Sequence, residues 1–129
     1  MRLKDDTVYF SYFGFFNKRE VRDLDVENRR VSVARKTYGF KGNTATQLLV
    51  PEDLFNSYKS GEISLNDLKM KYFREVLMKL DPKEIFNTYK GNILLCHEIE
   101  GCHREVINLW LKAQGYKTKE LTLGDLYEC

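Results

Sequence analysis

The sequence predicts one small α/β domain over residues 1–129, with an at least partly parallel sheet flanked by helices. Three stretches have the β-branched or aromatic character of strands, namely Val8–Phe13, Arg30–Arg35 and Ile93–Cys96. Segments with helical periodicity lie between the second and third of them, and strands separated by helices are typical of a parallel sheet. A length of 129 residues suits a single domain.

The composition is that of an ordinary globular protein, with 43% hydrophobic and 31% charged residues. No run approaches the ~20 apolar residues of a membrane span, so we expect no membrane partner. The N-terminal stretch Met1–Asp6 is charged and lacks the apolar core of a secretory signal. Three cysteines without disulfide-dense spacing favour free thiols and a reducing, cytoplasmic setting. The net charge of +2 does not by itself indicate nucleic acid.

The N-terminal third begins with the aromatic-rich strand Val8–Phe13. Its aromatic side chains are interpreted as core, and the alternative is a platform on which single-stranded nucleic acid would stack. Asn17–Arg30 is polar and predicts a surface connection. The next strand, Arg30–Arg35, ends in a cation, and the glycine-containing stretch Lys36–Asn43 predicts a loop.

Three helices are predicted before the last apolar strand, over Val50–Tyr58, from Ser64 to Leu80, and from Asp81 onward. Ser64 and Asp67 resemble a capping box. The apolar positions of this second helix recur every three or four residues and mark one buried face: Leu65, Leu68, Tyr72, Val76 and Leu80. After Ile93–Cys96 a helix over Arg104–Gln114 is capped by Gly115 and followed by a half-exposed strand, Tyr116–Leu121.

The functional residues are expected at the junction between the Ile93–Cys96 strand and the helix that opens at Cys102. Ligands in open α/β sheets gather at such carboxyl ends of strands, beside helix N-termini. Cys102 at a helix start has the position of a thiol nucleophile, and His103 and His97 could act as bases. Glu98 could orient a histidine, and Arg104 could hold a carboxylate or phosphate.

Other interpretations of these residues stay open. Cys96 could be a small buried side chain, or could form a disulfide with Cys102. The cysteines and histidines of this stretch invite zinc, although their spacing departs from the usual zinc motifs, and we expect no metal or cofactor. Arg104 could form a structural ion pair with Glu98 or Glu100.

Several pieces of the chain, in this order, resemble the family called domain of unknown function 488. The most specific are Leu95-Cys96-His97-Glu98 and Cys102-His103-Arg104; the weaker ones are Val8–Phe13, Val31–Arg35, Leu49–Pro51, Tyr58–Ile63 and Trp110-Leu111. The resemblance spans residues 8–121. It implies a small α/β fold and singles out these positions: Ser11, Arg35, Cys96, Glu98, Cys102, His103 and Arg104. It implies no activity, because that family was defined without one.

Two departures from the family pattern concern the rim of the expected pocket. His97 stands where relatives usually carry an aromatic residue, and the loop between Cys96 and Cys102 is short. Both are consistent with a specialised ligand, as in a phage-encoded or stand-alone member.

The sequence therefore predicts a protein that binds an anionic, nucleotide-like small molecule at this junction. The ligand-binding residues would be Ser11, Arg35, Cys96, His97 and Arg104. If the protein is an enzyme, Cys102 would be the nucleophile, with His103 and Glu98 beside it. The alternative is a non-catalytic module that binds nucleic acid through the basic segment Lys18–Lys41, or binds a partner protein. The sequence does not predict the oligomeric state.

Overall fold

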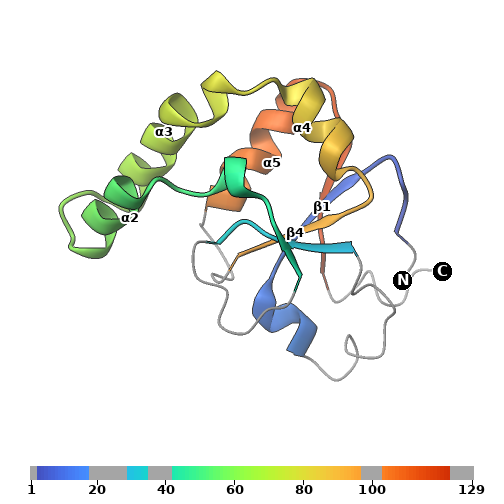
Figure 1. The fold of residues 1–129 in the computed structure, drawn as a ribbon, viewed down its shortest axis with the longest axis horizontal. Coiled ribbons are helices and arrows are strands. Elements are labelled where there is room, and N and C mark those ends of the chain that lie inside the picture. Colours follow the sequence, from blue (N-terminus) through green and yellow to red (C-terminus); the bar gives the residue numbers. More distant parts are fainter. Residues whose placement is uncertain (1–2, 18–28, 35–41, 97–102, 123–129) are drawn as a thin grey trace.

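The computed structural model describes residues 3–17, 29–34, 42–96 and 103–122 (Figure 1). Their strands form one five-stranded sheet in the order β3-β2-β4-β1-β5, and every neighbouring pair is parallel. The strands are β1 Val8–Tyr12, β2 Arg30–Ser32, β3 Asn43–Thr44, β4 Ile93–Cys96 and β5 Thr118–Glu120. The predicted α/β class is confirmed, and the described sheet is parallel throughout.

Strand β4 is the centre of the sheet. It pairs with β1 from Tyr9↔Ile93 to Tyr12↔Cys96, and on its other side with β2 from Arg30↔Ile93 to Ser32↔Leu95. All four β4 residues are buried. A strand covered on both faces needs apolar side chains at successive positions, which explains why this stretch is continuously apolar.

The described residues include four α-helices: α2 Glu52–Lys59, α3 Leu65–Glu75, α4 Pro82–Tyr89 and α5 His103–Ala113. They also include the 3-10 helices η1 Phe13–Asn17, η3 Thr46–Leu48 and η4 Leu77–Lys79. Figure 1 shows α4 and α5 on one side of the sheet and η1 on the other, and the α2–α3 pair extends beyond the sheet. No helix among the described residues is long and apolar enough to cross a membrane.

Each face of the sheet has its own hydrophobic core. Under the helices, Phe10 and Leu94 pack with Tyr72, Ile107 and Leu111. The opposite core is smaller and consists of Tyr9, Phe15, Ile93, Leu95 and Leu121. Tyr9, Phe10 and Phe15 are buried, which confirms the core prediction for these three aromatics, whereas Tyr12 and Phe13 are half-buried and pack against the smaller core. The three buried rings belong to the interior. They offer no exposed surface on which a base could stack.

The predicted helix starts are confirmed by their hydrogen bonds. Asp67 N donates to Ser64 Oγ at 3.1 Å and Ser64 N donates to Asp67 Oδ2 at 3.3 Å, which completes the capping box of α3. Lys83 N donates to Asp81 Oδ1 at 3.0 Å at the start of α4. Pro51 lies at the N-cap of α2, one position before the first turn. Gly115 has a φ of 89°, as the left-handed cap after α5 requires.

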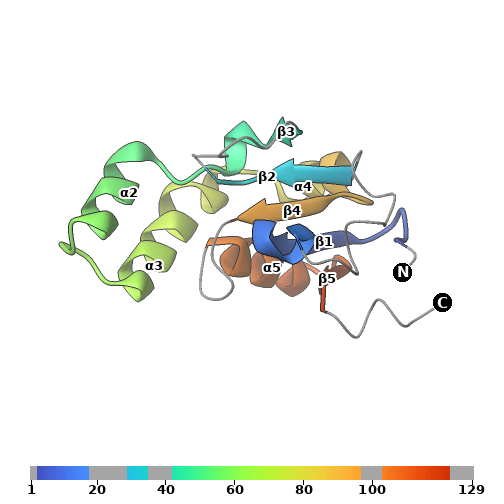
Figure 2. The same cartoon turned by 90° about the horizontal axis from the view of Figure 1, so that it is seen from below.

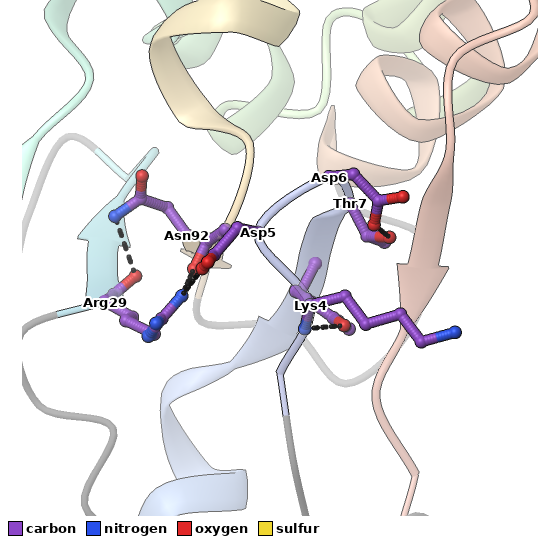
Figure 3. A network of polar contacts seen from close by, with 8 residues as sticks. Lys4, Asp5, Asp6, Thr7, Arg29 and Asn92 are labelled. Atoms are coloured by element: carbon purple, nitrogen blue, oxygen red, sulfur yellow. Dashed lines mark hydrogen bonds and ion pairs between the residues drawn. The ribbon is translucent and has the colours of Figure 1, made fainter.

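The amino edge of the sheet is held by a polar network around Arg29 (Figure 3). Arg29 Nη1 donates to Asp5 Oδ1 and to the Gly91 carbonyl, both at 3.0 Å. The Arg29 carbonyl accepts a hydrogen bond from Asn92 Nδ2 at 3.3 Å. A Cβ at Gly91 would lie 3.2 Å from Arg29 Nη1, and the φ of Gly91 is 83°. These contacts tie the starts of β1, β2 and β4 together at the edge opposite the expected site.

Candidate ligand site at the carboxyl edge of the sheet

The sheet has a topological switch point between β1 and β4. The chain leaves β1 into η1, whose Phe15 packs in the smaller core, and it follows β4 with α5, whose Ile107 and Leu111 pack in the core on the opposite face. Neighbouring parallel strands with connections on opposite faces leave a crevice outside their carboxyl ends. Figure 2 shows the β2 and β4 arrowheads pointing toward the side where the α2–α3 pair lies.

Arg104 lies in the first turn of α5 and is almost completely buried. Its Nε and Nη2 donate to Glu120 Oε1 at 3.0 and 2.7 Å, and Nη1 lies 2.7 Å from Cys96 Sγ. The guanidinium carbon is 5.9 Å from the centre of the Tyr12 ring. Arg104 therefore forms the structural ion pair that was one of its two predicted roles, but with Glu120. Glu98 and Glu100, the partners suggested by the sequence, lie outside the described residues.

His103 is the first residue of α5, and its Nε2 lies 2.7 Å from the Val33 carbonyl oxygen. A carbonyl oxygen only accepts, so Nε2 carries the proton and, in the neutral ring, Nδ1 is the basic nitrogen. The His103 and Tyr72 rings form a T-shaped pair with their centroids 5.1 Å apart. If His103 is a general base, it acts through Nδ1.

Cys96 ends β4 and is 1% exposed. Its sulfur is disulfide-bonded, so the prediction of free thiols is wrong at this residue. Cys102 and Cys129, the chain's other cysteines, lie outside the described residues. The prediction was based on the number and spacing of cysteines in the sequence. These do not determine whether two sulfur atoms lie close enough in the fold to form a disulfide.

Ser11 is fully buried, and within the described part of the chain its hydroxyl has no hydrogen-bond partner. It pairs with Leu95, whereas the next residue, Tyr12, pairs with Cys96. Side chains alternate between the faces of a strand, so Ser11 points into the smaller core, away from Arg104. The structure brings Cys96, His103 and Arg104 together on the α5 side and leaves Ser11 on the other face.

Four of the predicted site residues lie outside the described residues: Arg35, His97, Glu98 and Cys102. Most of the basic segment Lys18–Lys41 lies there too. Among the residues that the structure describes, no three His, Cys, Asp or Glu side chains are grouped as metal ligands. Two of the four donors that suggested zinc, His97 and Cys102, lie outside the described residues.

Three residues near the site were not predicted from the sequence: Glu120, Tyr12 and Tyr72. Glu120 contacts Arg104 because β5 lies beside β1, and local sequence does not show that these two strands are neighbours. Tyr72 was predicted as a core residue, which is confirmed. Its hydroxyl donates to the Leu48 carbonyl at 2.7 Å, and burial raises its pKa far above the usual range.

Comparisons with protein-family models, curated protein sequences and solved structures found no match to this chain. The resemblance to the domain of unknown function 488 stays a prediction.

Proposed function

We propose that this protein binds an anionic, nucleotide-like small molecule in the crevice at the carboxyl ends of β1 and β4. The observation that carries the proposal is the switch point between these two strands, since their connections run to opposite faces of the sheet. In open α/β sheets such a crevice is where ligands bind.

The preference for an anion rests on the groups that begin α5. This helix spans 11 residues and starts at the same edge, so its first-turn N–H groups and the positive end of its dipole favour negative charge. The buried guanidinium of Arg104 adds a fixed positive charge one residue into the helix. Glu120 engages its Nε and Nη2 and holds its orientation, while Nη1 faces Cys96.

The aromatic residues at the junction of β1 and η1 suit the base of a nucleotide. Tyr12 and Phe13 are half-buried, in contrast to the buried Tyr9 and Phe10 before them. Aromatic rings that keep part of their surface open can stack on a base, which is worth about 1–3 kcal/mol per base in known complexes. An anion site beside the Tyr12 ring therefore fits a nucleotide, in which a sugar links the phosphate to the base.

A catalytic role is a further prediction from the sequence. It needs Cys102 as nucleophile, Glu98 as orienting carboxylate and the Nδ1 of His103 as base. Two of these three residues, Cys102 and Glu98, lie outside the described part of the chain. We therefore propose ligand binding and no reaction.

The test is native mass spectrometry of the purified protein, compared with its denatured mass, followed by titration with ADP and with adenosine. We expect a phosphate-bearing molecule to be retained, or ADP to bind at least about tenfold more tightly than adenosine, because charge-assisted hydrogen bonds are worth about 1.5–3 kcal/mol. Arg104→Ala should weaken ADP binding. Arg74→Ala removes the same charge at an exposed position of α3 and should not.

Folding of each variant is checked by the fluorescence of Trp110, the single tryptophan, which is 9% exposed. A folded wild-type protein that binds ADP no better than adenosine and retains no small molecule would contradict the proposal.

A further inference from the structure

The outer face of α3 carries large apolar side chains that the fold leaves exposed. Met70 is 54% exposed and Phe73 is 39% exposed. The α3 residues that pack in the core, Leu68 and Tyr72, are two positions from Met70 on either side, which is about half a turn of helix. Met70 therefore points away from the core. The α2–α3 pair extends beyond the sheet in Figure 1, so a second molecule can approach α3 from the side.

The apolar surface continues from α3 onto α5. Lys69 Nζ lies 3.5 Å from Glu105 Oε2, so these flanks of the two helices adjoin. Phe73 and Leu109 lie four residues further along the same flanks, and α3 and α5 run in the same general direction in Figure 1. Leu109 is 59% exposed. Met70, Phe73 and Leu109 thus form one exposed apolar surface, the α3–α5 patch, and contiguous patches of this kind mark interaction sites.

Two charges of opposite sign lie on either side of Met70. Asp67 precedes it by three residues and Arg74 follows it by four, so all three share one stripe of α3, and all three are exposed. Asp67 and Arg74 are about 10 Å apart along the helix, too far for an ion pair with each other. Within the part of the chain that the structure describes, Arg74 forms no ion pair with another carboxylate.

We propose that the α3–α5 patch is the interface of a symmetric dimer of this protein, in which the α3 helices of two copies pack antiparallel around Met70. A twofold axis through Met70 brings Asp67 of each copy beside Arg74 of the other, so both charges meet their opposites. A stripe whose charge changes sign across its apolar centre is complementary to itself under such an axis. This property identifies a second copy of the chain as the partner.

The dimer is expected to be weak. A stable interface buries about 800 Å² per partner, and α3, with 11 residues, is only about 16 Å long. Apolar contact around Met70 supplies most of the affinity, because exposed ion pairs contribute little. The two ion pairs fix the antiparallel orientation, since like charges placed opposite one another oppose association. We therefore expect a dissociation constant in the micromolar range, on the order of 10–100 μM.

The first experiment is sedimentation equilibrium of the full chain, without nucleotide, from about 10 μM to about 1 mM. We expect the mass to rise from one chain toward two with concentration. Met70→Glu should stay monomeric, because it places two carboxylates at the axis. Lys83→Glu, a charge reversal at an exposed position of α4, should dimerise like wild type. Trp110 fluorescence checks that each variant is folded.

A charge exchange tests the antiparallel arrangement itself. Asp67→Lys places two cations opposite one another at both ends of the interface, and Arg74→Glu places two carboxylates there. Each variant alone should dimerise at least about tenfold more weakly than wild type. An equimolar mixture should form the heterodimer at wild-type strength, since every pair is again of opposite charge. Native mass spectrometry distinguishes this heterodimer by its mass.

A wild-type chain that stays monomeric at about 1 mM would overturn the inference. So would a dimer that survives in denaturant, which is covalent, or a Met70→Glu variant that dimerises like wild type. Failure of the Asp67→Lys and Arg74→Glu chains to pair with each other would also overturn it, because a loss of packing alone is not repaired by mixing. None of these outcomes depends on ADP binding, so this inference and the proposed function fail separately.

Discussion

Replacement of Tyr72 by phenylalanine tests how the α3 helix is joined to the core. The Tyr72 side chain is fully buried, and its hydroxyl donates to the Leu48 carbonyl at 2.7 Å. The variant keeps the ring but leaves that buried carbonyl without its partner. We expect a loss of about 1–2 kcal/mol of unfolding free energy at pH 7. For a domain of this size this corresponds to a fall in Tm of roughly 3–10 °C.

The same variant has a distinctive pH dependence. Burial raises the pKa of Tyr72 above its ordinary value of 10.0, so the folded state keeps the proton when the unfolded state loses it. The stabilisation is fully present well below pH 10 and is lost as the pH rises through and above 10. The loss is about 0.4 kcal/mol at pH 10 and about 1.4 kcal/mol at pH 11, and phenylalanine does not incur it. The stability gap between wild type and Tyr72→Phe should therefore close near pH 11.

Urea denaturation followed by Trp110 fluorescence measures this gap at pH 7, 9, 10 and 11. Other ionising groups, such as the buried Tyr89, are present in both proteins and cancel in the difference. Leu54→Ala is the control, because it removes buried apolar surface and no titrating group, so its gap from wild type should not vary with pH. A Tyr72→Phe gap that stays constant up to pH 11 would refute the reasoning.

Three further predictions concern the stability of the fold, each measured by urea or thermal unfolding. Ser64→Ala should cost about 1 kcal/mol, since it removes the side-chain half of the α3 capping box; an unchanged midpoint would contradict this. Glu120→Ala should cost about 1–2 kcal/mol because it removes the carboxylate that pairs with the buried Arg104 guanidinium at 2.7 Å, and a gain in stability would oppose that reasoning. Leu94→Ala in the central strand should cost about 2–5 kcal/mol, whereas exposed Met78→Ala should stay within about 0.5 kcal/mol; equal losses would count against the core assignment.

The helix starts were predictable because their causes are local. Ser64 with Asp67, and Asp81 with Pro82, each specify a cap within four residues of sequence. The two-residue strand β3 was not predicted, and it lies at the end of a stretch interpreted as a loop. Asn43 and Thr44 are polar and exposed, and a strand this short shows no alternation.

The sequence predicted where the candidate site lies in the chain, but not which side chains contact one another there. The stretch from Cys96 to Arg104 does run from the central strand to the following helix, as local sequence indicates. The partner of Arg104 and the face on which Ser11 lies depend on strand order and register. Those are set by contacts between distant segments, which single-residue patterns do not encode.

The position of β1 within the sheet has a consequence for synthesis. This strand lies between β4 and β5, with Tyr9 opposite Ile93 and Val8 opposite Thr118. At roughly 5–20 residues per second, a ribosome takes on the order of 5–20 s to add the segments that β1 must pair with. During that time an aromatic strand that will lie in the interior of the sheet has neither of its two partner strands. The order of strands in the sheet thus leaves the hydrophobic segment Val8–Tyr12 without its partner strands until the segments up to Glu120 have been synthesised.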